Sequence, residues 1–180
     1  LAGRYRAVIN YGNISSEQFI EIDDDPRIII SKDNKKAIYD SLKYLEKLKS
    51  IAYRATTQLA ESKITAEKYL EDLKTIDKEK YSDIIKISEK TIEKIDDLFK
   101  LFLGKQDKRQ GITEDEYLSF VKLYYQAYQY VESRQNGITV TEKKLIEQTR
   151  NKLEDNLKKF NLFFENEWVQ YKILSVSYTH

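Results

Sequence analysis

The fold of this chain is decided by residues 32–75, KDNKKAIYDSLKYLEKLKSIAYRATTQLAESKITAEKYLEDLKT. Apolar residues recur along them at every third or fourth position, which is the spacing of one face of an α-helix. Ser31 precedes the stretch and is a typical N-cap residue. At ~1.5 Å per residue such a helix is roughly 60 Å long, a length typical of helical bundles and stalks. Its apolar positions are Ile38, Leu42, Leu45, Leu48, Ala52, Ala55, Leu59, Ala66, Leu70 and Leu73.

Two further helices are predicted beyond it. A second apolar stripe runs from Tyr81 to Phe102 and stops before Gly104, a residue that often ends a helix in a left-handed conformation. Thr113 and Glu116 have the spacing of a capping box and mark the start of a third helix.

A fourth helix completes the pattern. Asn136-Gly137 ends the third helix, and Thr139 with Glu142 forms a second capping box. The apolar stripe that follows continues to Leu174. Short loops between long helices make neighbours in sequence antiparallel, so we expect a mainly α protein built as an up-down four-helix bundle.

The first residues predict a β-hairpin before these helices. Residues 4–11, RYRAVINY, and residues 18–22, QFIEI, are rich in β-branched and aromatic residues, and Gly12-Asn13 between them supplies a turn. A two-stranded hairpin alone is only marginally stable in water. These strands must therefore pack on the helices, pair with another chain, or belong to a sheet outside this sequence.

Asp25, Pro26 and Arg27 form a structural junction between the two parts. The proline holds Asp25 in an extended conformation and prevents a helix from running back through the segment. We therefore divide the chain into residues 1–30, the hairpin and an extended linker, and residues 31–180, the bundle. Because the sequence opens directly on a strand pattern, we expect the chain to be part of a longer protein.

Composition excludes several classes of function. The 180 residues carry a formal net charge of +1, which removes the basic footprint of a nucleic-acid-binding protein. No apolar stretch is long enough to span a membrane. There is no cysteine, and the only histidine is His180 at the end of the chain. We predict no catalytic residues, no metal ligands and no cofactor, and thus no enzyme activity in this chain.

The third predicted helix carries more apolar surface than one contact needs. Leu118 and Tyr125 lie beyond one edge of its main stripe, and Leu123 and Tyr130 lie beyond the other. One interpretation is a central helix that touches neighbours on both sides. The other is that these four residues form a docking surface for a partner.

Four short segments suggest a family. Gly3–Ile9 (GRYRAVI), Asp25–Arg27 (DPR), Ser31–Asp33 (SKD) and residues 163–168 (FFENEW) resemble the C-terminal region of large bacterial β-propeller proteins of the sortilin and bacterial-neuraminidase-repeat type. Those proteins are often labelled glycosyl hydrolases. The resemblance implies that a propeller precedes this region, that the hairpin ends a small β-sandwich, and that the protein is exported to the periplasm or cell surface.

The resemblance implies where this region lies in a larger protein but not which reaction that protein catalyses, because any reaction of the propeller would use residues outside this sequence. The favoured function is therefore a non-catalytic C-terminal accessory or interaction module, whose partners are the N-terminal domains of the parent chain. One alternative is an accessory part of a glycan-processing hydrolase. Another is a stand-alone structural domain that forms a homodimer through the hairpin edge or the tyrosine-rich helix.

Overall fold

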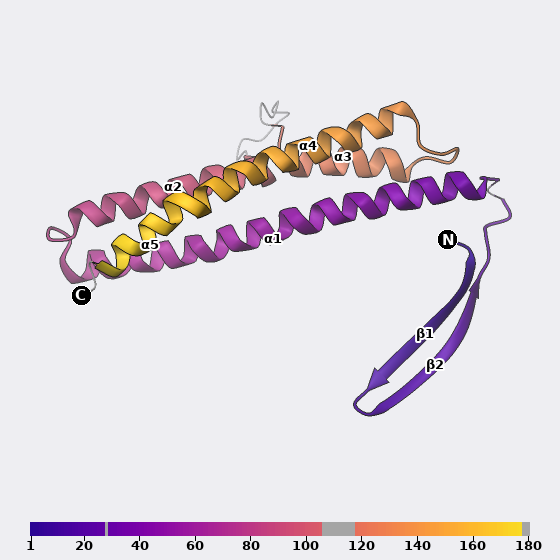
Figure 1. The fold of residues 1–180 in the computed structure, drawn as a ribbon, viewed down its shortest axis with the longest axis horizontal. Helices are drawn as coiled ribbons and strands as arrows, with labels where there is room; N and C mark the ends of the chain where they lie inside the picture. Colours follow the sequence, from indigo (N-terminus) through magenta and orange to yellow (C-terminus); the bar gives the residue numbers. More distant parts are fainter. Residues whose placement is uncertain (28, 106–117, 178–180) are drawn as a thin grey trace, which may run out of the picture.

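The computed structural model describes residues 1–27, 29–105 and 118–177 and is mainly helical, with an N-terminal hairpin, as predicted (Figure 1). The strands are β1 (Gly3–Tyr11) and β2 (Ile14–Ile22). The helices are α1 (Lys32–Asp77), α2 (Ser82–Leu103), α3 (Phe120–Glu132), α4 (Val140–Leu162), the π-helical turn η1 (Phe163–Glu167) and α5 (Trp168–Ser177). The last three follow one another without a break and make one helical path.

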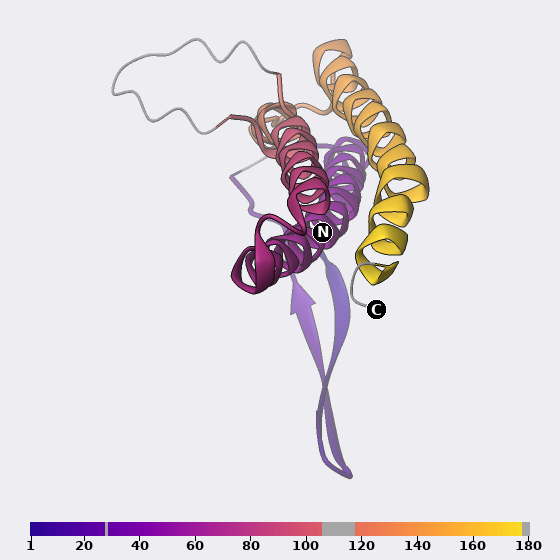
Figure 2. The ribbon, with the colours of Figure 1, turned by 90° about the vertical axis from the view of Figure 1, so that its left-hand side faces the viewer.

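The helices form three long rods. α1 runs the length of the helical part, α2 and then α3 run back along it one after the other, and α4, η1 and α5 return beside both (Figures 1 and 2). The predicted up-down four-helix bundle is not confirmed, because α2 and α3 run in the same direction. The segment between them spans 104–119, so α3 is not forced to double back on α2 as a short loop would require.

A continuous core joins the three rods. Most of the predicted stripe along α1 is buried, and two of its buried members, Ala52 and Ala55, have small side chains that let the neighbouring helices come close. Aromatic side chains fill the space opposite them, and Phe102 meets Phe160 edge to face with 6.5 Å between the ring centroids. The buried core aromatics are Phe102, Phe120, Tyr124, Phe160, Phe163, Trp168 and Tyr171.

Most predicted helix ends are confirmed. The Ser31 side chain accepts a hydrogen bond from the Asn34 amide at 3.2 Å and caps α1. Gly104 follows α2 with φ +87° and donates its N–H to the Lys100 carbonyl at 2.9 Å. The capping box predicted at Thr113 and Glu116 lies outside the described residues. α3 begins later than expected, at Phe120, with Ser119 as its N-cap.

The π-helical turn explains how the last rod keeps its apolar face on the core. Phe163 and Trp168 are both buried but lie five residues apart, a spacing that an α-helix would turn by about 140°. The Trp168 N–H donates to the Phe163 carbonyl, so the wider turn brings the two side chains to one side. Asn166 donates its side-chain amide to the Leu162 carbonyl at 3.0 Å and satisfies a group at this turn.

Candidate functional site

The hairpin separates apolar from charged side chains onto its two faces. Residues directly opposite each other in an antiparallel pair point to the same side, and the register pairs Tyr5 with Ile20 and Tyr11 with Ile14. The apolar face of the hairpin consists of Tyr5, Ala7, Ile9, Tyr11, Ile14, Ile20 and Ile22, with Gly3, Ser16 and Gln18 completing the pairs. No charged residue lies on it.

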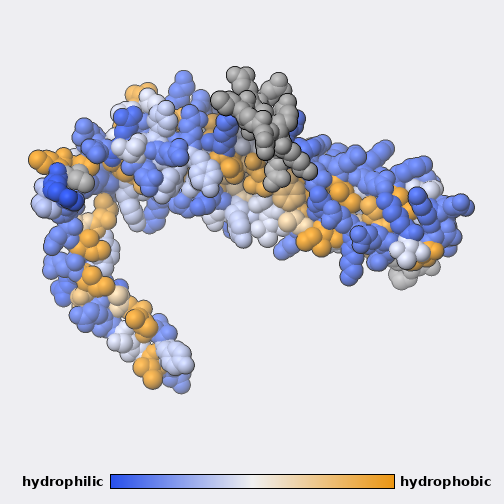
Figure 3. Space-filling model, turned by 180° about the vertical axis from the view of Figure 1, so that it is seen from behind, coloured by the Kyte–Doolittle hydropathy of each residue, from blue (hydrophilic) through white to orange (hydrophobic). Residues whose placement is uncertain are grey.

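This apolar face is open to solvent. Ile9, Tyr11 and Ile14 near the turn are 74%, 83% and 72% exposed, and the other large side chains, Tyr5, Ile20 and Ile22, are all exposed too. The hairpin projects to one side of the helices in two perpendicular views (Figures 1 and 2), and hydrophobic residues run along it in the surface view (Figure 3). The helices of this chain therefore leave the face uncovered.

On the opposite face of the hairpin, both arginines find partners across the two strands. Arg6 forms an ion pair with Glu17 at 3.6 Å, and the Arg4 guanidinium lies over the Phe19 ring, 4.4 Å from its centroid. Cross-strand pairs of this kind hold two strands in register and suit a surface that faces water. The hairpin thus has the pattern of an antiparallel sheet with one face on a core and the other in solvent.

Both strands lack proline, lysine and an inward-pointing charge, three features that often protect a sheet edge. Proteins that keep an edge strand unpaired often place proline, lysine or an inward-pointing charge on it. β1 and β2 contain neither proline nor lysine, and their charges lie on the outward face. Two unprotected edges and one open apolar face on the same ribbon identify the hairpin as the candidate functional site.

The predicted junction residues Asp25 and Arg27 bond to each other rather than to the helices. Arg27 donates its backbone N–H and its side chain to the Asp25 carboxylate at 2.8–3.0 Å, and these bonds hold the pKa of Asp25 below its usual value. The Arg27 side chain is otherwise exposed. An ion pair between Asp24 and Lys35 at 2.7 Å joins the linker to α1. The contact to the helices therefore comes from Asp24, one residue before the predicted junction.

The four residues predicted as a docking surface do not lie together. Leu118, Tyr125 and Tyr130 are 51%, 57% and 46% exposed, whereas Leu123 is 4% exposed and belongs to the core. Tyr125 and Tyr130 are five residues apart on α3 and point to different sides of it. Tyr125 instead shares a small apolar groove of about 170 Å³ with the exposed Tyr53 of α1.

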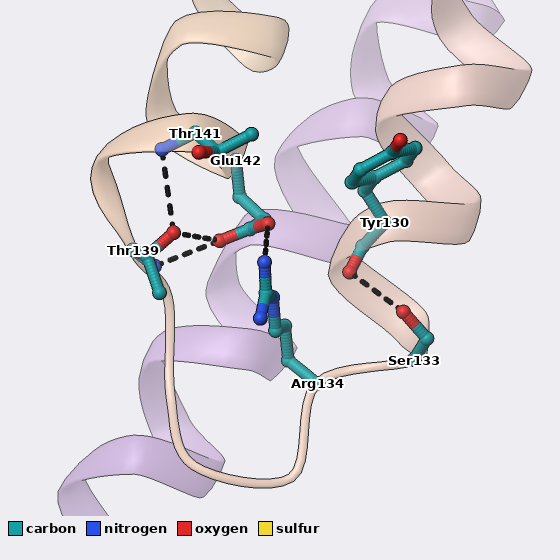
Figure 4. Close-up of polar contacts among 6 residues, drawn as sticks. All are labelled: Tyr130, Ser133, Arg134, Thr139, Thr141 and Glu142. Atoms are coloured by element: carbon teal, nitrogen blue, oxygen red, sulfur yellow. Dashed lines mark hydrogen bonds and ion pairs between the residues drawn. The ribbon is translucent and has the colours of Figure 1, made fainter.

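A buried polar cluster fixes the turn between α3 and α4. The Glu142 carboxylate accepts the Thr139 N–H at 2.9 Å and the Thr139 hydroxyl at 2.6 Å, which confirms the predicted capping box (Figure 4). No sequence pattern predicted the role of Arg134, whose guanidinium donates to the same carboxylate. Since Glu142 and Arg134 lie on either side of the turn, this cluster supports the fold rather than a ligand.

The described residues show neither a metal site nor a membrane span. No group of three or more His, Asp or Glu side chains among them is placed to hold a metal ion. None of the described helices is both long and apolar enough to cross a bilayer. Comparison with protein-family models, with curated proteins and with solved structures finds no match to this chain.

Proposed function

We propose that this chain is a non-catalytic interaction module that joins a β-sheet of a larger protein through its hairpin. The open apolar face, with Ile9, Tyr11 and Ile14 each more than 70% exposed, carries this proposal. A free two-stranded ribbon is marginal in water. Covering six large apolar side chains and pairing two strand edges would stabilise it in a way that the helices of the same chain do not.

The two strands of the hairpin are better suited to pair with another β-sheet than to bind in a groove between helices. Both strands are nine residues long, so a paired strand would add hydrogen bonds over roughly 30 Å. The charged face would stay in water while the apolar face would form one inner layer of a sandwich, as in stacked antiparallel sheets. The three helical rods would then act as a rigid spacer or as a second surface for partners.

The resemblance to the C-terminal region of bacterial β-propeller proteins supplies a specific partner. In that arrangement a small β-sandwich stands between the propeller and the helices, and Gly3–Ile22 would be its last two strands. The protein would then be exported, and glycan or peptide chemistry would belong to the propeller. This family assignment rests on the short motifs quoted above, and the exposed hairpin supports the position that they imply.

Hydrogen exchange on the parent protein tests the proposal. Amides of β1 and β2 are expected to exchange rapidly in the 180-residue chain and at least about 100-fold more slowly when the preceding domains are present, because a paired strand is protected. Ile9→Asp together with Ile14→Asp should abolish that protection without unfolding the helices. Equal exchange with and without the preceding domains would contradict the proposal.

Two controls separate the alternatives. Light scattering that shows a dimer, lost in the Ile9→Asp and Ile14→Asp variant, would favour a stand-alone dimerisation domain instead. Removing residues 32–180 from the parent should leave turnover and substrate affinity unchanged if the helices are a non-catalytic module. A large fall in either constant would favour an accessory part of a glycan-processing enzyme.

A further inference from the structure

A second open site lies on the helical part, far from the hairpin. It is a groove of about 520 Å³ between α2 and the rod formed by α4 and η1. Sites for small ligands in proteins enclose roughly 300–1,000 Å³, with a mostly apolar lining and a few polar groups that fix orientation. This groove has the size and the lining of such a site.

The floor of the groove is apolar and partly exposed. Leu98 and Phe163 are nearly buried and form its base, whereas Leu162 on its α4 side is 62% exposed. A large aliphatic side chain at that exposure leaves apolar surface in water, and a ligand that covered it would gain binding free energy from its burial. The floor thus favours a ligand with an apolar body.

The two ends of the groove differ in charge. At one end Lys94 of α2 forms an ion pair with Glu167 of η1, which ties the two walls together. Towards the other end lie Lys100, Lys105 and Lys159. With four lysines and two carboxylates in its lining, the groove carries a formal charge of +2 in a chain whose net charge is +1. Anions are therefore favoured, and at the lysine end.

Lys159 is the cation best suited to hold such an anion. Lys94 is paired with Glu167, and Lys100 is paired with Asp97 at 2.6 Å. Lys159 makes no ion pair within the described part of the chain, although its helical neighbour Lys158 pairs with Asp155. Its ammonium would gain a partner on binding without losing one.

The π-helical turn builds one wall of the groove. Phe163 in the floor and Glu167 at one end are the first and last residues of η1. Turns of this kind are rare and occur frequently at functional sites. The turn therefore shapes the floor and places Glu167 in its ion pair with Lys94.

We propose that this groove binds a small anionic amphiphile, a single apolar chain or ring system that ends in a carboxylate or similar group. Its apolar body lies over Leu98, Leu101, Leu162 and Phe163, and its anionic group lies beside Lys159. α2 rises roughly 14 Å from Lys94 to its end at Leu103, which suits a chain of medium length. Lys94 and Glu167 lie at the boundary between this groove and a second hollow of about 430 Å³ beside it, and their ion pair separates the two.

Titration calorimetry with dodecanoate tests the proposal, with dodecanol and dodecyltrimethylammonium as neutral and cationic probes below their micelle concentrations. Dodecanoate is expected to bind one per chain and up to about fivefold more tightly than dodecanol, since an exposed ion pair contributes up to ~1 kcal/mol, which is a factor of about 5, and the cationic probe should bind less tightly than dodecanoate. Equal affinity for the three probes would overturn the proposal.

Two matched variants locate the site. Lys159→Gln should remove the preference for dodecanoate, and Lys158→Gln, one residue away on the same helix, should keep it. Leu162→Ser should weaken all three probes while leaving the melting temperature unchanged, because that side chain is exposed. In an NMR titration with dodecanoate, chemical shift changes confined to residues 3–22 would place the probe on the hairpin and would equally overturn the proposal.

Discussion

The carboxylate of Glu142 lies fully buried against the guanidinium of Arg134, and the two residues clamp the turn between α3 and α4 (Figure 4). Burial alone would raise the pKa of Glu142. The bonds from Thr139 and Arg134 outweigh it and lower the pKa to about 2. The charged carboxylate is thus part of what holds α4 against the rest of the fold.

Acid should lower the free energy of unfolding, because the carboxylate of Glu142 becomes protonated. The pKa of Glu142 is about 2 in the folded chain and 4.5 as its ordinary value, so the stabilisation is complete above pH 4.5 and is lost as the pH falls towards 2. Glu142→Gln should lower the free energy of unfolding at pH 7 by about 2 kcal/mol and flatten its fall below pH 4.5. Urea denaturation across this pH range measures both.

Glu147→Gln is the matched control for that experiment. Glu147 lies on the same helix, is largely exposed, and has a long contact of 3.7 Å to Arg150. Exposed ion pairs contribute about 0–1 kcal/mol, so the variant should stay close to the wild type at all pH values. A Glu142→Gln protein with an unchanged acid profile would show that the buried pair does not support the fold.

A close approach to Gly137 should make any side chain there costly. Its φ is +95°, and a Cβ atom would lie 2.6 Å from the Asn34 Oδ1 atom. Asn34 itself donates its side-chain amide to the Asn136 carbonyl at 3.0 Å and ties the start of α1 to this turn. Gly137→Ala should therefore lower the free energy of unfolding by about 2–3 kcal/mol in thermal or urea melts.

The double variant Asn34→Ala with Gly137→Ala separates crowding from backbone strain. Removing the Asn34 side chain relieves the clash but not the positive φ. The two substitutions together should cost less than the sum of their separate costs, because they share one contact. Strict additivity would mean that the turn relaxes away from Asn34 without a clash.

The sequence predicted features that depend on local spacing. The capping box of Thr139 and Glu142 and the end of α2 at Gly104 involve residues a few positions apart, so short-range stereochemistry decides them. The hairpin turn at Gly12, with φ +57°, follows from the same kind of rule. These elements lie where the pattern placed them.

Features that depend on contacts between distant residues were missed. The direction of α3 relative to α2 follows from packing on α1 and α4, which no spacing within either helix encodes. The burial of Leu123 fits the interpretation of a helix with neighbours on both sides, but the sequence could not choose between that and a docking surface. The π-helical turn at Phe163–Glu167 was not predicted, since the apolar stripe that continues to Leu174 was read as one α-helix.

Substitutions on α3 should separate its core from its surface. Leu123→Ala removes a buried side chain and should cost about 2–4 kcal/mol in urea denaturation, by lost burial and a cavity. Tyr125→Ser and Tyr130→Ser remove exposed rings and should cost less than about 1 kcal/mol each. A large loss for Tyr130→Ser would show that its exposed ring nevertheless supports the fold.

Removal of residues 1–23 should leave the helical part stable. The apolar face of the hairpin is open, and the ion pair of Asp24 with Lys35 on α1 remains after this truncation. The thermal melting of residues 24–180, followed by circular dichroism at the helical minimum, should match that of the whole chain within a few degrees, because few contacts are lost. The truncated protein should also be less prone to aggregation, since nine exposed large apolar side chains and two open strand edges are gone. Lys35→Ala in the whole chain is the companion variant, and it should change the melting temperature little because an ion pair whose partner Asp24 is exposed contributes about 0–1 kcal/mol. Cooperative loss of helix on truncation would instead mean that the hairpin packs on the helices in solution, and the site proposed on it would then be closed.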